Sequence, residues 1–129
     1  MAQFKIYGRT EFLQASHRAI GDVVHAAAVR TLELPADKRF HRFVPLEPWQ
    51  LDAPPDRSAR YLIVEVLMFS GRTVATKKAL VRALMDDLAA ALSLAPADVE
   101  VTILESPREN WGIRGRHGDE LVLPYRVEV

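Results

Sequence analysis

The chain opens with alternating apolar and polar residues. Phe4 and Ile6 fall on one side of the segment 3–7 and Lys5 falls on the other, which is the period of a half-buried strand. Gly8 follows this segment and predicts a turn. We therefore expect the opening segment to be a strand of the fold, because a signal peptide or a membrane span needs an unbroken apolar run.

A helix is expected next, over residues 11–32. Four apolar residues and one threonine recur at steps of three, four or seven and form one stripe, made up of Leu13, Ile20, Val24, Ala27 and Thr31. Thr10 is placed to cap this helix, and Pro35 prevents its continuation. Residues 39–44 predict a second strand, and residues 45–59 predict a loop, because they hold half of the chain's 8 prolines.

The second half of the chain repeats this order. Residues 61–69 are apolar on both faces except at Glu65, which is typical of a strand covered on both sides. Thr73 is placed to cap a second helix that ends before Pro96, with an apolar stripe formed by Leu80, Val81, Leu84, Met85, Leu88 and Leu92. Residues 99–104 then alternate as a fourth strand.

The triplet Gly-Arg-Thr occurs at both strand-to-helix junctions, at residues 8–10 and 71–73. This coincidence supports a duplicated β-α-β unit in a single domain, with pseudo-repeats over about 1–60 and 61–129. Right-handed crossovers then place both helices on one face of a four-stranded mixed sheet, with short extra strands, in an α+β fold. Two helices leave the other face of residues 61–69 open, so we expect it to pack on the sheet of another subunit.

Composition narrows the classes of function. The 129 residues fit one domain, and the absence of cysteine excludes thiolate catalysis, Cys-ligated zinc and disulfides. The 17 Lys and Arg residues balance the 17 Asp and Glu residues, so neither nucleic acid nor a membrane is an expected partner. No metal or other cofactor is expected, since no metal-binding spacing is found among His17, His25, His41 and His117. The expected location is the cytoplasm.

Three motifs carry a resemblance to a known family. Residues 70–73 (Ser-Gly-Arg-Thr) precede residues 77–80 (Lys-Lys-Ala-Leu), and residues 109–115 (Glu-Asn-Trp-Gly-Ile-Arg-Gly) follow the fourth expected strand. With these motifs the chain resembles the tautomerase superfamily over nearly its whole length. The stretch 34–39 (Leu-Pro-Ala-Asp-Lys-Arg) and the chain length are more similar to the malonate semialdehyde decarboxylase-like branch than to the short 4-oxalocrotonate tautomerases. The resemblance implies a homotrimer with sites between subunits.

The resemblance also implies a mechanism in which an amino-terminal proline, neutral near pH 7, acts as proton shuttle or nucleophile. No proline follows Met1 in this chain. If Met1 is removed, Ala2 offers a primary amine whose ordinary pKa of about 8 is lowered by burial and nearby cations, and which can form a Schiff base. If Met1 stays, the amine moves by one residue. Ala2 is thus a candidate catalytic residue, and an ordinary strand end is the alternative.

Arg72 stands where the family places an arginine that binds a substrate carboxylate. A guanidinium can donate two parallel hydrogen bonds to a carboxylate, which fixes the substrate's orientation as well as its position. The alternative is a surface arginine that pairs with a carboxylate across a subunit contact. Trp111 similarly matches the aromatic wall of the family's pocket, and a purely structural contact under the final strand is the alternative.

Asp37 and Lys38 depart from the family pattern. The decarboxylase-like branch has an acid immediately before an arginine, whereas here Lys38 precedes Arg39 and the acid is Asp37. A slip of one residue reverses the direction of a side chain in an extended segment. Asp37 is the candidate for polarising the substrate or activating water, and Lys38 for binding an anion, while a solvated turn of mixed charge is the alternative for both.

Two functions are compatible with these residues. The first is an enzyme that tautomerises or decarboxylates a small 2-oxo, enol or β-oxo carboxylate, with Arg72 holding the carboxylate and the terminal amine handling the proton or the carbonyl. The second is a catalytically silent trimer that binds a small anion through Arg72 and Lys38 or serves as an assembly partner.

Overall fold

The computed structural model describes all residues from 1 to 129. Four long strands and two long helices are followed by a small hairpin. Their bounds are β1 Ala2–Arg9, α1 Thr10–Leu32, β2 His41–Leu46, β3 Leu62–Phe69, α2 Val74–Leu92, β4 Val99–Ser106, β5 Gly112–Ile113 and β6 Arg116–His117. Each long element lies within a few residues of its predicted position. None of the helices combines the length and hydrophobicity that crossing a lipid bilayer requires.

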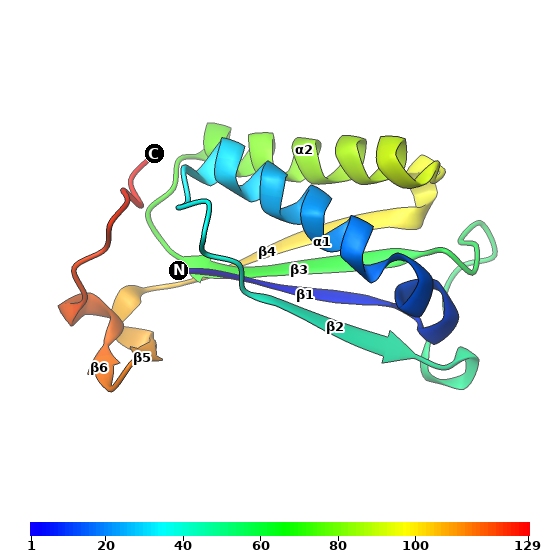
Figure 1. Cartoon of the computed structure of the whole chain (residues 1–129), viewed down its shortest axis with the longest axis horizontal. Coiled ribbons are helices and arrows are strands. Elements are labelled where there is room, and N and C mark those ends of the chain that lie inside the picture. The colour runs from blue at the N-terminus through cyan, green and yellow to red at the C-terminus, as the bar shows by residue number, and fades with distance from the viewer.

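The four long strands form one mixed sheet in the order β2-β1-β3-β4. β1 runs parallel to β2 and β3 runs parallel to β4, whereas β1 and β3 meet antiparallel in the middle of the sheet. α1 and α2 lie side by side over one face of this sheet (Figure 1). The predicted fold, a duplicated β-α-β unit with both helices on one face, is confirmed.

The core lies between the two helices and the sheet. On β3, every second residue is completely buried against the helices, namely Leu62, Val64, Val66 and Met68. The predicted helical stripes face them, with buried side chains at Leu13, Ile20, Val24 and Ala27 of α1 and at Leu80, Leu84 and Leu88 of α2. Burial of a Leu, Ile or Val side chain contributes about 1.5–3 kcal/mol, so this layer is the main hydrophobic contribution to folding.

The second strand-to-helix junction has the structure predicted from the sequence, and the first junction does not. Thr73 caps α2 as predicted, because its Oγ1 accepts a hydrogen bond from the backbone N–H of Thr76 at 3.1 Å. At the first junction, β1 continues through Gly8, which pairs with Pro45 of β2, so the predicted turn at Gly8 is wrong. α1 then begins at once, and Thr10 is its first helical residue rather than its cap.

The opposite face of the sheet carries no helix (Figure 1). Ile63 and Leu67 of β3 are only partly buried on that face. Leu104 of β4, which pairs with Leu67, is 48% exposed. This single subunit therefore leaves apolar side chains of the central strands partly open to solvent, as the sequence predicted.

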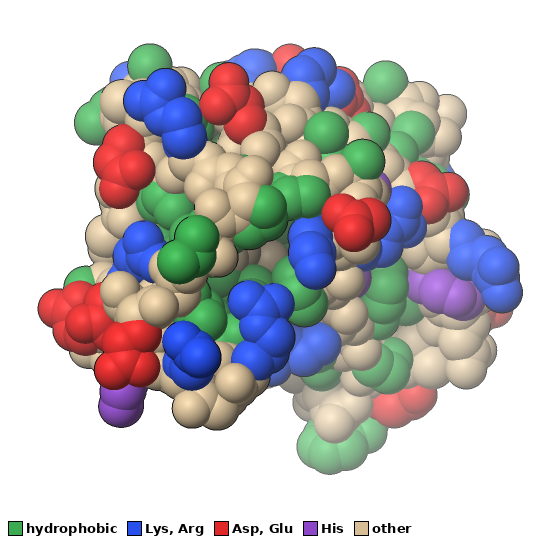
Figure 2. All heavy atoms as spheres, turned by 60° about the vertical axis from the view of Figure 1, so that its left-hand side comes forward, with side chains coloured by type: hydrophobic (Ala, Val, Ile, Leu, Met, Phe, Trp, Pro, Cys, Tyr) green, Lys and Arg blue, Asp and Glu red, His purple; other side chains and the backbone are tan.

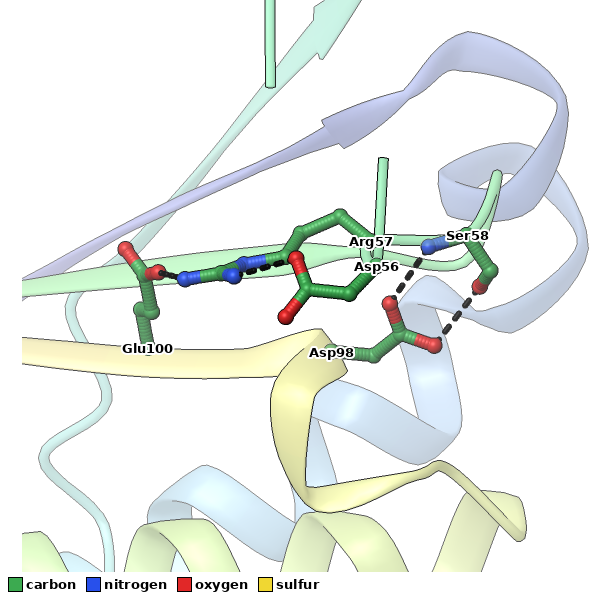
Figure 3. Close-up of polar contacts among 5 residues, drawn as sticks. All are labelled: Asp56, Arg57, Ser58, Asp98 and Glu100. Atoms are coloured by element: carbon green, nitrogen blue, oxygen red, sulfur yellow. Dashed lines mark hydrogen bonds and ion pairs between the residues drawn. The ribbon is translucent and has the colours of Figure 1, made fainter. Parts of the chain in front are cut away.

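A polar clamp fixes the long loop after β2 to the start of β4, at the end of the sheet away from Met1. The carboxylate of Asp98 is buried and accepts hydrogen bonds from the backbone N–H of Ser58 at 2.7 Å and from its Oγ–H at 2.6 Å (Figure 3). Beside it, Arg57 forms ion pairs with Asp56 and Glu100, each at 2.6 Å. These contacts order a loop that contains only one short 3₁₀ turn.

Candidate active site

The amino end of β1 lies in a cavity that the carboxyl-terminal segment helps to form. The Met1 amine donates a hydrogen bond to the hydroxyl of Tyr125, and the backbone N–H of Phe69 donates to the Met1 carbonyl at 3.2 Å. Burial, and then the positive charges of Arg72 and Arg108, lower the pKa of this amine from 8.0 to about 5. The amine is therefore neutral at pH 7, and its lone pair can accept a proton or attack a carbonyl.

Arg72 lies in the junction between β3 and α2 and is only 4% exposed. Its Nη1 donates to the carbonyl of Phe69 at 3.2 Å, so the backbone of Phe69 contacts Met1 through its N–H and Arg72 through its C=O. Nε and Nη2 of Arg72 are buried without a hydrogen-bond partner. Burial lowers the pKa of this guanidinium, against the opposing effect of Tyr125 and two nearby carboxylates. Each unpaired buried donor costs about 1–3 kcal/mol, so an anion that accepts from both would be held firmly.

The backbone at Gly71 sets the position of Arg72. Gly71 has a φ of +135°, which side chains rarely allow, and a Cβ added there would lie 3.1 Å from Cγ1 of Val127. Val127 is itself buried and anchors the carboxyl-terminal segment in this junction. One tight turn therefore positions both Arg72 and the segment that carries Tyr125.

The cavity in front of the amine is small, about 40 Å³, and mostly apolar. Most of its lining side chains are hydrophobic, its two charged ones are Lys38 and Arg114, and no carboxylate lines it. Figure 2 shows Lys and Arg side chains gathered around a hollow that has hydrophobic side chains inside. No group of three or more His, Cys, Asp or Glu side chains is placed to hold a metal ion. This lining favours a small anion with an apolar part.

The sequence-predicted residues divide into those that reach the cavity and those that do not. Ala2 is buried and lines the cavity, and Lys38 lines it from the segment that follows α1. Arg72 is buried and bonded to Phe69 next to Met1, but it is not one of the residues that line the cavity of this subunit. Asp37 is exposed and does not line it, because residues 36–37 form a turn in which the Lys38 N–H donates to the Pro35 carbonyl at 3.0 Å. This agrees with the solvated turn that was the alternative for Asp37, and not with an extended segment. The catalytic roles of Ala2 and Asp37 and the binding role of Lys38 stay predictions.

Trp111 supports the site from behind rather than lining the cavity of this subunit. Its ring packs edge to face on Phe69, with the ring centres 5.2 Å apart. The indole Nε1–H is buried and has no hydrogen-bond partner. Its predicted role as an aromatic wall for the ligand stays a prediction.

A family model described as a tautomerase enzyme matches residues 38–114, which is more than half of the chain. The chain belongs to the tautomerase family. It is similar to the 2-hydroxymuconate tautomerase of Pseudomonas putida, with 42% identity over 57 residues that make up 44% of this chain and 90% of that protein. The 2-hydroxymuconate tautomerase of Comamonas testosteroni is 37% identical over 57 residues, with the same shares of each chain.

Solved tautomerase structures cover almost the whole chain. The malonate semialdehyde decarboxylase FG41, inhibited by 3-bromopropiolate, is 28% identical with a TM-score of 0.80, over 95% of this chain and 99% of that one. A native fused 4-OT is 20% identical with a TM-score of 0.81, over 92% of this chain and 98% of that one. The predicted membership, including the decarboxylase-like branch, is confirmed.

Sequence reasoning missed what the carboxyl-terminal segment contributes to this tautomerase-family site. Tyr125 accepts a hydrogen bond from the Met1 amine, and the charge of Arg108 lowers the pKa of that amine. Neither residue was a candidate in the sequence analysis. A short signal was present, because apolar and polar residues alternate over residues 125–128, and in the structure more and less exposed positions alternate over 121–128. That period of two is typical of an extended segment with one face against the protein.

Proposed function

We propose that this tautomerase-family protein binds a small 2-oxo or enol carboxylate in the cavity and catalyses its keto–enol tautomerisation. Arg72 lies buried next to the cavity rather than in its lining, and it holds the carboxylate when the ligand reaches its Nε and Nη2, while the terminal amine moves the proton. One observation carries this proposal: the backbone of Phe69 bonds both Met1 and Arg72. The amine of Met1 has a pKa of about 5, and Nε and Nη2 of Arg72 are buried without partners. The first group suits proton transfer at pH 7 and the second suits a carboxylate.

The reaction needs only one proton to be moved between oxygen and carbon. The neutral amine accepts the proton of the enol hydroxyl, and the ammonium so formed donates a proton to C3 of the enolate, which leaves the amine neutral again. The Tyr125 hydroxyl accepts a hydrogen bond from the Met1 amine and so fixes the direction of its lone pair. If Met1 is removed, the amine of Ala2, which also lines the cavity, takes this role.

Tautomerisation suits this cavity better than a reaction that activates water. Accepting a proton from water usually needs a histidine or a carboxylate side chain, and neither lines the cavity, since Asp37 is exposed to solvent. Lys38 instead adds a cation at the same place. The relatives from Pseudomonas putida and Comamonas testosteroni are named tautomerases, which supports this choice.

We further propose that three copies assemble and that the open face of the sheet lies within this contact. Ile63, Leu67 and Leu104 give that face an apolar centre, which another sheet would cover. One related structure, the F6 fused 4-OT, is described as an asymmetric trimer and has a TM-score of 0.80 to this chain.

The proposal is tested by following ketonisation of the enols of phenylpyruvate and 2-hydroxymuconate by ultraviolet absorbance. We expect the wild-type protein to accelerate at least one of them, and Arg72→Ala to lower kcat/KM about 100-fold, because a charge-assisted bidentate contact is lost. Arg72→Lys keeps the charge but not the two parallel donors, so its kcat/KM is expected to lie between those of the wild type and Arg72→Ala. Arg116→Ala, at an exposed position of β6, is the matched control and is expected to match the wild type.

Light scattering and circular dichroism first establish that each variant is assembled and folded like the wild type. A folded Arg72→Ala or Arg72→Lys variant with unchanged KM and kcat would show that Arg72 does not hold the carboxylate. Wild-type protein that binds oxo acids in calorimetry without turnover would support the silent anion-binding function instead.

A further inference from the structure

We propose that Arg108 is a positioning residue that closes the carboxyl-terminal segment over the site and maintains the electrostatic environment of the terminal amine. Arg108 lies in the 3₁₀ turn Arg108–Asn110 that follows β4 and does not line the cavity. Its Nε and Nη2 already donate to backbone carbonyls, unlike those of Arg72, so Arg108 acts through other groups. The inference rests on the proposed function of the amine.

The first part of this role is the attachment of the segment that follows the hairpin. Nε of Arg108 donates to the carbonyl of Gly118 at 3.0 Å, and Nη2 donates to the carbonyl of Leu121 at 2.6 Å. A planar guanidinium can hold two carbonyls in this way, whereas a lysine ammonium has no such fork. Gly118 is buried against the same turn, and a Cβ added there would collide with the carbonyl oxygen of Arg108. Side chain and backbone of Arg108 thus both fix the start of the segment that leads to Tyr125.

The second part of this role is contact with the residue that joins the amine to Arg72. Cζ of Arg108 lies 5.4 Å from the centre of the Phe69 ring, within the range of a cation–π contact. The backbone of Phe69 in turn bonds Met1 through its N–H and Arg72 through its C=O. Arg108 therefore packs on the residue that fixes both candidate functional groups.

The third part of this role is charge. The Met1 amine is faced by Arg72 from the β3–α2 junction, by Tyr125 from the carboxyl-terminal segment and by Arg108 from the turn after β4, and Lys38 and Arg114 line the same cavity. After burial, Arg72 and then Arg108 lower the pKa of the amine. A bound carboxylate would neutralise Arg72, but Arg108 has two of its donor groups on neutral carbonyls. The bound carboxylate therefore leaves the charge of Arg108 unpaired, and Arg108 continues to lower the pKa of the amine in the substrate complex.

The test is a titration of the amine by nuclear magnetic resonance, in the absence of substrate. The chain has 3 methionines, so labelling them with ¹³C at Cα gives three signals, of which that of Met1 reports ionisation of the amine. Intact mass first identifies the first residue, and the label is placed on alanine if that residue is Ala2. Arg108→Gln removes the charge and the fork, Arg108→Lys removes the fork alone, and Arg116→Gln is a control that removes an exposed charge from the hairpin that follows.

We expect the wild-type amine to titrate near pH 5, and Arg108→Gln to raise its pKa by on the order of half a unit to one unit. Arg108→Lys should raise it less, and Arg116→Gln should leave it unchanged. Hydrogen exchange over residues 118–127 should become faster in both Arg108 variants, because the contacts to two carbonyls are lost.

An unchanged amine pKa in a folded Arg108→Gln variant, or unchanged exchange over residues 118–127, would overturn the inference. The signals of Met68 and Met85 show whether each variant is folded, since Met68 lies in the core. Turnover is not used, so a wild-type protein without tautomerase activity would reject the proposed function and leave this result standing.

Discussion

Arginine side chains in this chain differ in whether their donors are already used. Arg57 bonds two carboxylates through Nη1 and Nη2, which raise its pKa, and only its Nε is buried without a partner. Arg72 bonds one carbonyl and keeps Nε and Nη2 buried without partners. A buried cation with unused donors is unfavourable unless a ligand satisfies them, which is why Arg72, among these two, is the one suited to an anion.

A histidine on the inner side of β2 makes folding sensitive to acid. His41 packs edge to face on Phe4 at 5.5 Å between ring centres, and burial, followed by Arg39 and His25, lowers its pKa from 6.5 to about 4, with Asp22 acting in the opposite direction. The folded state therefore favours neutral His41. Its contribution to stability is complete above pH 6.5 and is lost as the pH falls from 6.5 to about 4.

We accordingly expect the free energy of unfolding of the wild type, from urea titrations, to decrease between pH 6.5 and 4. His41→Phe keeps an aromatic ring that cannot ionise, so its decrease over that range should be smaller. His17→Gln, at an exposed position of α1, is the control, and its free energy of unfolding should decrease over this pH range as much as that of the wild type. Equal slopes for the wild type and His41→Phe would show that protonation of His41 does not oppose folding.

Helices and strands were predicted well where a single periodicity decides them. α1 and α2 each bury one regular stripe, so their positions follow from local spacing. The junction at Gly8 was not predicted, because β1 is extended by its pairing with Pro45, a contact that local spacing does not contain. Thr73 was a correct cap because a real turn precedes it, whereas Thr10 follows β1 without a turn.

The loop after β2 offers a test of stability at a distance from the site. Asp98 accepts two hydrogen bonds from Ser58, and removing the buried carboxylate leaves the Ser58 N–H unpaired. Asp98→Ala should therefore lower the free energy of unfolding by about 2–3 kcal/mol, and Ser58→Ala by about 1 kcal/mol. Glu100→Gln, which affects only a more exposed ion pair, should change it by less than about 1 kcal/mol. Chemical denaturation measures all three, and a loss for Asp98→Ala no larger than that for Glu100→Gln would contradict this role of the clamp.

The site itself exists only in the complete fold. Met1 precedes β1, Arg72 lies in the junction between β3 and α2, Arg108 lies in the turn after β4, and Tyr125 lies in the final segment. Both chain ends lie on the same side of the molecule (Figure 1). The sequence could indicate Arg72 and the first strand through motif and resemblance. The alternation over residues 125–128 could indicate an extended segment there, but not the contacts of Arg108 with Phe69 and of Tyr125 with Met1, because these join distant parts of the chain.

The central claim is that a neutral terminal amine lies beside a carboxylate-binding arginine, and reductive trapping tests it most directly. The protein is incubated with pyruvate and cyanoborohydride at pH 7, so that the amine attacks the carbonyl carbon, water leaves and hydride reduces the imine to a stable secondary amine. Intact mass and peptide mapping locate the adduct. We predict one adduct at the first residue, formed about tenfold faster in native than in urea-unfolded protein, because an amine with a pKa near 8 is mostly protonated at pH 7. Trapping should slow in Arg72→Ala. An adduct that is absent, that spreads over the lysines, or that forms equally fast in unfolded protein would contradict the claim.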